Sequence, residues 1–190
     1  VEEGYEAPTE FELLTAMAFL YFAKVGVEYA VVEVGMGGLY DSTNVIVPVV
    51  SVITNVAMDH MQYLGNTLTE IAHNKAGIIK ESVPCVTAAS GEALTQIQKE
   101  AKEKHAPLYI YGRDFAEIAR HVVHGGQIVS FRIGEKETGD IHISLVGPHQ
   151  AINAAGAVMA LKIVSGSDPR VTGDAVRYGL AHTRWPGRFD

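Results

Sequence analysis

Residues 31–46 read VVEVGMGGLYDSTNVI, a β-branched run followed by a cluster of glycines. The run starts within residues 28–34, EYAVVEV, whose apolar character predicts a buried strand of a parallel sheet. One carboxylate, Glu33, interrupts it, and an acid in an apolar strand is costly unless it is hydrogen-bonded or binds a cation. Glu33 is therefore either a buried structural acid held by loop amides or a ligand at the carboxyl end of a strand, where open α/β sheets bind their ligands.

The sequence around this stretch predicts alternating helices and strands. TEFE at 9–12 fits a capping box before a helix that Gly26 ends, and TLTE at 67–70 begins a shorter helix that ends near Gly77. Residues 91–105 predict an amphipathic helix. Further strands are predicted by the short apolar runs at residues 49–54, 84–89 and 107–111. This order is typical of the α/β class, with a mostly parallel sheet flanked by helices.

After Gly112 the pattern changes to alternating apolar and polar residues. HVVHGGQIVSFRI at 121–133 and DIHISLV at 140–146 predict an antiparallel β meander at the edge of the sheet, with a turn at the paired glycines. Two helices are expected to follow, at 149–164 and 171–182. Because there is no repeat and no long linker, we expect one domain rather than two.

Composition narrows the class of protein. The chain has 190 residues, 47% hydrophobic and 19% charged, with a net charge of −7, which predicts a packed globular core and argues against a nucleic-acid surface. The one cysteine, Cys85, lies in an apolar run, so we expect it in the core rather than in catalysis, and it excludes a disulfide within the chain. No signal peptide is recognisable, and the longest apolar run, near residues 13–23, is too short to cross a bilayer. These features predict a cytoplasmic protein without membrane partners.

Two further side chains stand out besides Glu33. His60 follows Asp59 in the loop after the strand predicted at 49–54, so the carboxyl ends of two predicted parallel strands carry an acid and an imidazole. Lys75 lies at a helix end in an apolar frame between Ile71 and Ile78. Each has an ordinary alternative: His60 as a surface histidine, and Lys75 as a lysine whose stem packs while its amine reaches water.

Four blocks, in order and at matching spacing, resemble the folylpolyglutamate synthase and dihydrofolate synthase family, within the wider Mur-ligase group of ATP-dependent amide-forming enzymes. They are residues 9–23 (TEFELLTAMAFLYFA), 33–46 (EVGMGGLYDSTNVI), 51–80 (SVITNVAMDHMQYLGNTLTEIAHNKAGIIK) and 184–189 (RWPGRF). The resemblance implies a Mur-ligase central domain. It covers the chain from about Thr9 to Asp190.

The resemblance implies roles for individual residues. Glu33 and His60 would be magnesium ligands, and Lys75 would carry a carbamate whose oxygens suit Mg²⁺ better than an ammonium does. Asn153 in HQAINAA would contact the adenine of ATP, and Arg188 in WPGR would grip its phosphates. The implied cofactor is Mg²⁺, with ATP as co-substrate.

The sequence also departs from its relatives. Many relatives read Gly-Gly-Arg-Leu-Asp where this chain has Gly38-Leu39-Tyr40-Asp41, and Asn74 stands where an acid is common. No Gly-x-x-x-x-Gly-Lys-Ser/Thr phosphate loop occurs in the sequence. The chain starts at Val1 rather than Met and stops at Asp190. We therefore expect residues 1–190 to be part of an ATP-binding central domain, lacking an upstream phosphate loop and a downstream C-terminal domain, and inactive alone.

The implied reaction joins L-glutamate to a folate or dihydropteroate carboxylate through an acyl phosphate, in a parent protein expected to be monomeric. Two alternatives stay open at this point. One is a Mur-type peptidoglycan ligase, which shares the metal and carbamate arrangement, although the helix block at 9–23 favours the folate branch. The other is a non-catalytic nucleotide-binding or assembly domain, which the missing phosphate loop would fit.

Overall fold

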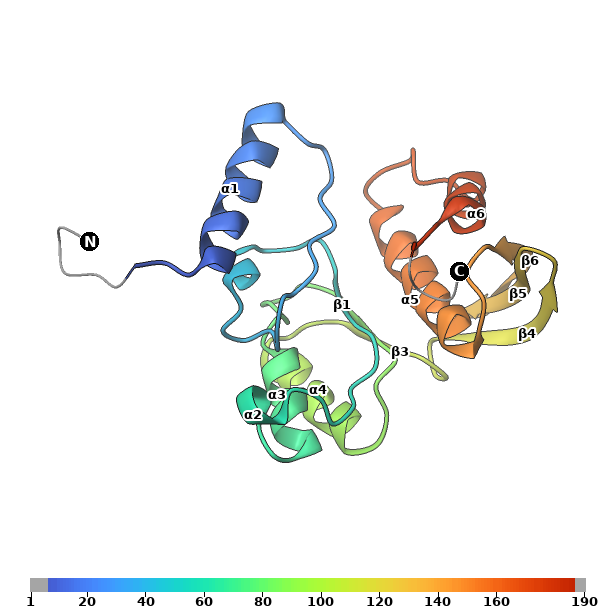
Figure 1. Ribbon diagram of the computed structural model, residues 1–190. Coiled ribbons are helices and arrows are strands. Elements are labelled where there is room, and N and C mark those ends of the chain that lie inside the picture. Colours follow the sequence, from blue (N-terminus) through green and yellow to red (C-terminus); the bar gives the residue numbers. More distant parts are fainter. Residues whose placement is uncertain (1–6, 187–190) are drawn as a thin grey trace.

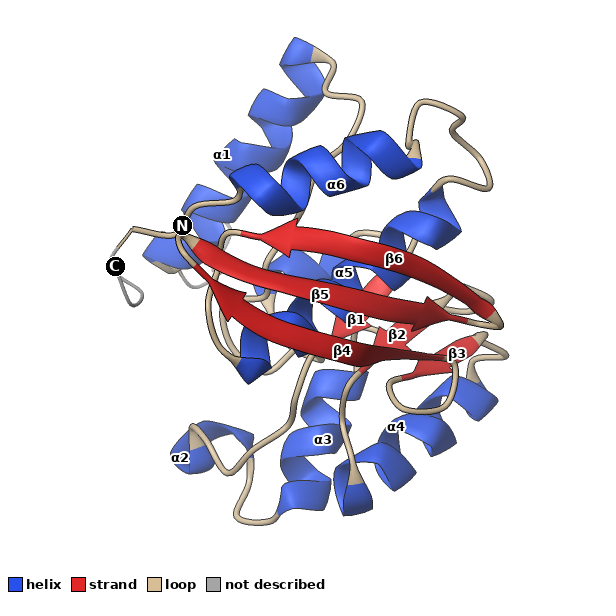
Figure 2. Cartoon of the chain, turned by 90° about the vertical axis from the view of Figure 1, so that its right-hand side faces the viewer, coloured by secondary structure: helices blue, strands red, loops and turns tan. Residues whose placement is uncertain are grey.

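A three-stranded parallel sheet lies at the centre of the first half of the chain (Figures 1 and 2). The computed structural model describes residues 7–186. The strands are short and lie in the order β1 (Ser51–Ile53), β2 (Cys85–Thr87), β3 (Leu108–Ile110). Helices α3 (Leu68–Ala76) and α4 (Gly91–Glu103) connect them and pack on one face. The α/β class and each of these predicted elements are confirmed.

The meander forms a second, separate sheet (Figure 2). Strands β4 (Phe115–Val123), β5 (Gly126–Ile133) and β6 (Lys136–Ile143) are antiparallel, with the first turn at the predicted glycines. Helices α5 (Pro148–Val164) and α6 (Gly173–His182) complete the chain as predicted. The expected position at the edge of the parallel sheet is wrong: only one isolated bridge joins the two sheets within residues 7–186, because the meander packs its apolar face on α5 instead.

Strand β2 contributes to two hydrophobic cores, one on each face of the parallel sheet. Cys85 packs with Ile53 and Ile97 in the core beneath α3 and α4. Its neighbour Val86 faces the opposite way, into a core that contains Phe131 and α5. Successive side chains of a strand point to opposite faces, so one three-residue strand joins both halves of the molecule.

Helix α1 (Glu10–Val25) has the predicted ends. Thr9 and Glu12 form the reciprocal capping box, and Gly26 ends the helix in the left-handed conformation at φ 67°. No residue of α1 is buried, although the helix is apolar on most sides. A helix of this composition is normally covered by other structure. Among the helices of residues 7–186, none is both long and apolar enough to cross a membrane.

Residues 28–34 do not form the predicted buried strand. The segment has no strand assignment, and Val31 is fully exposed, with 102% of its reference area accessible. A parallel strand is defined by hydrogen bonds to a neighbour, and within residues 7–186 β1 pairs only with β2. The apolar composition of residues 28–34 therefore suits a buried strand, but no strand in the described part of the chain pairs with this segment.

Because α1 is exposed and one side of α3 is buried, shortening a side chain should lower the free energy of unfolding by different amounts in the two helices. In the 190-residue chain, Ile71→Ala should lower the free energy of unfolding by about 3 kcal/mol, because Ile71 is fully buried in α3 and its loss leaves a cavity. Leu20→Ala, at a residue that is 71% exposed on α1, should change it by less than about 0.5 kcal/mol. Urea unfolding monitored by circular dichroism measures both values. Equal losses would contradict the packing described here.

Candidate nucleotide and metal site

The glycine-rich loop after Glu33 is shaped by Asp41. This carboxylate accepts hydrogen bonds from the amides of Met36 and Thr43, each at 2.9 Å, and so caps the short helix η1 (Ser42–Val45). Partial burial acts to raise the pKa of Asp41, but hydrogen bonds from Thr43 and the Met36 amide outweigh it and hold the pKa below its usual value. No role for Asp41 was predicted from the sequence, although an Asp two residues before a Thr is a recognisable capping signal.

The loop packs directly on the C-terminal end of α3. The amide of Leu39 donates to the carbonyl of Asn74 at 2.8 Å. A Cβ atom on Gly38 would lie 2.9 Å from the carbonyl oxygen of Asn74 and 3.0 Å from that of Lys75. On the other side, a Cβ on Gly77 would lie 2.4 Å from the Cα of Leu39. The glycines are required because two backbones approach each other more closely than any side chain permits.

Asn44 and Lys80 complete this junction. The side-chain amide of Asn44 donates to the carbonyls of Leu39, at 3.1 Å, and Gly77, at 3.0 Å. The Lys80 amine in turn donates to the carbonyl of Asn44 at 2.8 Å. Neither residue was singled out from the sequence, because their partners are backbone groups that only folding brings near. Together they fix the glycine loop against the helix that carries Lys75.

Glu33 is exposed, and the prediction that it is buried is wrong. It lies in segment 28–34, which forms no strand, and its carboxylate has no hydrogen-bond or ion-pair partner within residues 7–186. Loop amides therefore do not hold it, as the structural interpretation required. A carboxylate without a protein partner keeps its oxygens available for a cation, which suits a magnesium ligand.

His60 lies in a loop with unusual backbone geometry. It precedes the single-turn helix α2 (Met61–Leu64), and its φ is 49°. A left-handed conformation is uncommon for a residue other than glycine and is often found at functional sites. The imidazole is exposed and lies 3.6 Å from the carboxylate of Asp59, so an acid accompanies the imidazole in this loop.

Lys75 is half-buried in the last turn of α3. Ile71 and Ala76 beside it are fully buried, which confirms the apolar frame predicted for the lysine stem. Its amine has no carboxylate or hydrogen-bond acceptor as a partner within residues 7–186. Lys75 thus differs from a lysine held in a salt bridge, because no carboxylate of the described residues pairs with its amine.

The structure brings together the segments that carry these three candidates. The side-chain amide of Asn74 donates to the carbonyl of Leu64 at 3.3 Å, so the end of α2 lies against the end of α3. A Cβ on Gly37 would lie 2.7 Å from the Leu64 side chain, so the glycine loop reaches the same point. In the described residues, no cluster of three or more His, Cys, Asp or Glu side chains could hold a metal. Mg²⁺ is commonly bound by only one or two carboxylates together with substrate phosphates and water, so a single exposed carboxylate such as Glu33 is compatible with a magnesium ligand.

Asn153 lies at the carboxyl edge of the parallel sheet. It lines a small hollow between α5 and the carboxyl ends of two strands, formed with Thr54 after β1 and Thr87 at the end of β2. This is where open α/β sheets bind ligands, as expected for a nucleotide contact. Its side-chain amide donates to Gln150 at 3.4 Å, and Asn153 is exposed. The remaining predicted contact, Arg188, lies outside the described residues.

Cys85 is a core residue, as predicted. It is fully buried in β2, and burial raises the pKa of its thiol to about 12. The reactive thiolate is therefore not populated in the folded protein near neutral pH.

The fold defines an α/β domain in which the loop that carries His60 follows the carboxyl end of β1, and Asn153 lies beside the carboxyl ends of β1 and β2. The comparison with known families agrees. The Mur ligase middle domain matches residues 4–161, and the chain belongs to that family.

Relatives of known name are similar over nearly the whole chain. A dihydrofolate synthase/folylpolyglutamate synthase of Bacillus subtilis is 43% identical over 189 residues, which are 98% of this chain and 44% of that protein. The apo form of FPGS from L. casei superposes with a TM-score of 0.95 at 37% identity, covering 100% of this chain and 47% of the other. The folylpolyglutamate synthase of Mycobacterium tuberculosis with ADP and AMPPCP gives 0.87 at 38% identity, covering 100% and 43%. The chain thus spans less than half the length of these relatives.

The close approach at Gly38 predicts a large effect from one methyl group. Gly38→Ala should lower the free energy of unfolding by about 2 kcal/mol, because the added Cβ meets the backbone of α3. Gly179→Ala is the matched control, since an added Cβ there meets nothing within 4 Å and the residue lies inside α6. The control should stabilise the protein by about 0.5–1 kcal/mol. If urea unfolding shows that Gly38→Ala leaves the free energy of unfolding unchanged, the packing of the loop on α3 is contradicted.

Proposed function

We propose that this chain is part of the ATP-binding central domain of a ligase that joins L-glutamate to folate or dihydropteroate. The observation that carries the proposal is the similarity to an FPGS–AMPPCP–folate complex, with a TM-score of 0.95 at 37% identity over 100% of this chain. That protein binds a nucleotide analogue and a folate. Three features of this chain support the same chemistry. Glu33 and the Lys75 amine have no partner among the described residues, and a small hollow lies beside Asn153.

The proposed reaction proceeds in two steps. An oxygen of the substrate carboxylate attacks the γ-phosphorus of ATP, which forms an acyl phosphate and releases ADP. The amine of glutamate then attacks the activated carbonyl carbon, so an amide bond forms, phosphate leaves and the amine gives up a proton. Catalysis of this kind depends mainly on positioning and on electrostatic stabilisation of the transferring group, and requires no covalent nucleophile from the protein.

Each candidate residue has a separate role in this proposal. Glu33 and His60 would hold Mg²⁺ together with a carbamate on Lys75, formed when the neutral amine adds to carbon dioxide and loses a proton. The ion would supply positive charge that neutralises the phosphates. Asn153 would bind the adenine at the carboxyl ends of β1 and β2, and Arg188 would bind phosphate oxygens through its planar group of donors.

We also propose that the parent protein has further chain that covers α1 and supplies the phosphate loop. Support comes from the length of the relatives, from the exposed apolar side chains of α1, and from the unpaired segment 28–34. A monomer in the cytoplasm is the simplest arrangement for such an enzyme, and size-exclusion chromatography with light scattering of the full-length protein tests the monomer.

The central test is folate-dependent ADP release by the full-length parent protein. It should require glutamate and either tetrahydrofolate or dihydropteroate, and assaying the two separately identifies the acceptor. Glu33→Gln should reduce turnover on the order of 100-fold, because it removes an anionic ligand. The matched control Glu135→Gln, an exposed carboxylate in the turn before β6, should stay within about twofold of wild type.

Three results would overturn this proposal. They are turnover with a muramyl-peptide acceptor and none with a folate, the absence of any nucleotide-dependent turnover in the full-length protein, and an unaffected Glu33→Gln variant. The first would favour a peptidoglycan ligase, and the second a non-catalytic domain. The 190-residue chain alone is expected to release no ADP above background.

The carbamate on Lys75 has a distinct signature. Lys75→Ala in the full-length protein should lose nearly all turnover, and acetate should restore part of it by supplying the missing carboxylate oxygens. Lys102→Ala, an exposed lysine on α4, should be active and insensitive to acetate. Removal of carbon dioxide and bicarbonate should lower the activity of wild type but not of acetate-rescued Lys75→Ala. A fully active Lys75→Ala would exclude the carbamate.

A further inference from the structure

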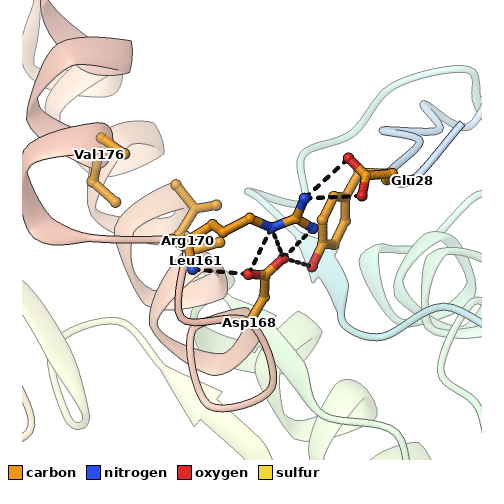
Figure 3. A pocket seen from close by; sticks show the side chains of 8 residues that line it. Glu28, Leu161, Asp168, Arg170 and Val176 are labelled. Carbon is orange, nitrogen blue, oxygen red and sulfur yellow. Dashed lines mark hydrogen bonds and ion pairs between the residues drawn. The ribbon is translucent and has the colours of Figure 1, made fainter.

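Four polar side chains join two parts of the chain that are far apart in sequence (Figure 3). The hydroxyl of Tyr29 donates to Asp168 at 2.8 Å across 139 positions. The guanidinium of Arg170 binds both oxygens of Glu28, at 2.9 and 3.1 Å, across 142 positions. These side chains line one side of a pocket of about 360 Å³, whose apolar wall includes Leu161 and Val176.

The geometry of this cluster is more specific than that of an ordinary surface ion pair. Asp168 is only 8% exposed, and it receives the Arg170 backbone amide at 2.8 Å as well as guanidinium nitrogens at 2.7–3.1 Å. Arg170 thus binds two carboxylates at once, a use of the planar fork that a lysine does not reproduce. Hydrogen bonds from Arg170 and Tyr29 hold the pKa of Asp168 well below its usual range.

The cluster is the upstream anchor of the segment that carries Glu33. Residues 30–34 form no hydrogen bond of their own within the described part of the chain. The next anchor downstream is the loop where Asp41 accepts the amide of Met36. Glu33 therefore lies between two anchors, and one of them is attached to the loop between α5 and α6.

We propose that Glu28, Tyr29, Asp168 and Arg170 form a clasp that positions Glu33 for magnesium-dependent nucleotide binding. The four act through Glu33 in this proposal and not on the reacting atoms, so they are positioning residues. The clasp also ties the Glu33 segment to the end of α5, the helix that carries Asn153. The clasp thereby fixes the position of Glu33, the proposed metal ligand, relative to Asn153, the proposed adenine contact. This inference rests on the proposed function.

The test uses equilibrium binding of the non-hydrolysable analogue AMPPCP to the full-length protein, by calorimetry with and without Mg²⁺. Tyr29→Phe and Arg170→Met should reduce the Mg²⁺-dependent gain in affinity about tenfold, as removal of groups that orient a metal ligand commonly does. Their affinity for AMPPCP without Mg²⁺ should stay within about twofold of wild type. Arg170→Lys should show a partial loss, because it keeps the charge but not the fork.

Arg113→Met is the matched control, because Arg113 also pairs with a carboxylate, Asp114 at 2.8 Å, but in the loop before β4. It should leave both affinities unchanged. An unchanged Mg²⁺-dependent gain in Tyr29→Phe and Arg170→Met, or equal losses with and without Mg²⁺, would overturn the clasp. Tyr29→Phe keeps the ring and removes only the hydroxyl, so it tests the clasp with little risk that the variant fails to fold.

The same measurement separates this inference from the proposed function. If Glu33→Gln abolishes the Mg²⁺-dependent gain and the clasp variants do not weaken it, the metal role of Glu33 stands and the clasp is wrong. If Glu33→Gln itself has no effect, the metal role fails, and the clasp proposal fails with it. If the Mg²⁺-dependent gain in affinity is lost in Glu33→Gln and reduced in the clasp variants, while Arg113→Met binds normally, both the metal role of Glu33 and the clasp are supported.

Discussion

The structure depends on burial of β2 on both of its faces. Cys85 and Val86 are adjacent in sequence, yet they belong to different hydrophobic cores, because side chains alternate along a strand. One core joins the sheet to α3 and α4, and the other joins it to α5 and the meander. Since β2 is also the middle strand, its carboxyl end lies between the loop that carries His60 and the helix that carries Asn153. The position of the proposed nucleotide site follows from this single strand.

A second constraint, the contact of two backbones, sets the local geometry of the proposed metal site. At Gly38 and Gly77 the glycine loop meets the end of α3 too closely for any Cβ. The contact places the chain that follows Glu33 against the turn that contains Lys75, and Asn44 holds it there with two hydrogen bonds. The glycines therefore serve close packing of protein on protein.

Much of the fold was predictable because its signals are local. Capping boxes at Thr9 and Thr67 and the alternation after Gly112 gave correct helices and strands, since each depends on neighbours a few residues away. Two predictions failed for one reason. Residues 28–34 were expected in the sheet and the meander at its edge, and both depend on which strand lies alongside, which a run of apolar residues does not specify. Glu33 was placed in the interior by the same error.

The sequence by itself determined the α/β class, most of the helices and strands, and the core position of Cys85. These follow from composition, periodicity and capping motifs, which are properties of the chain alone, whereas the magnesium and nucleotide roles were implied by a family resemblance. Only the tertiary structure decided that Glu33 is exposed, that Asn44 closes the glycine loop, and that Arg170 meets Glu28 across 142 positions. Such contacts join residues far apart in sequence, and their energy depends on distances that exist only after the chain has folded.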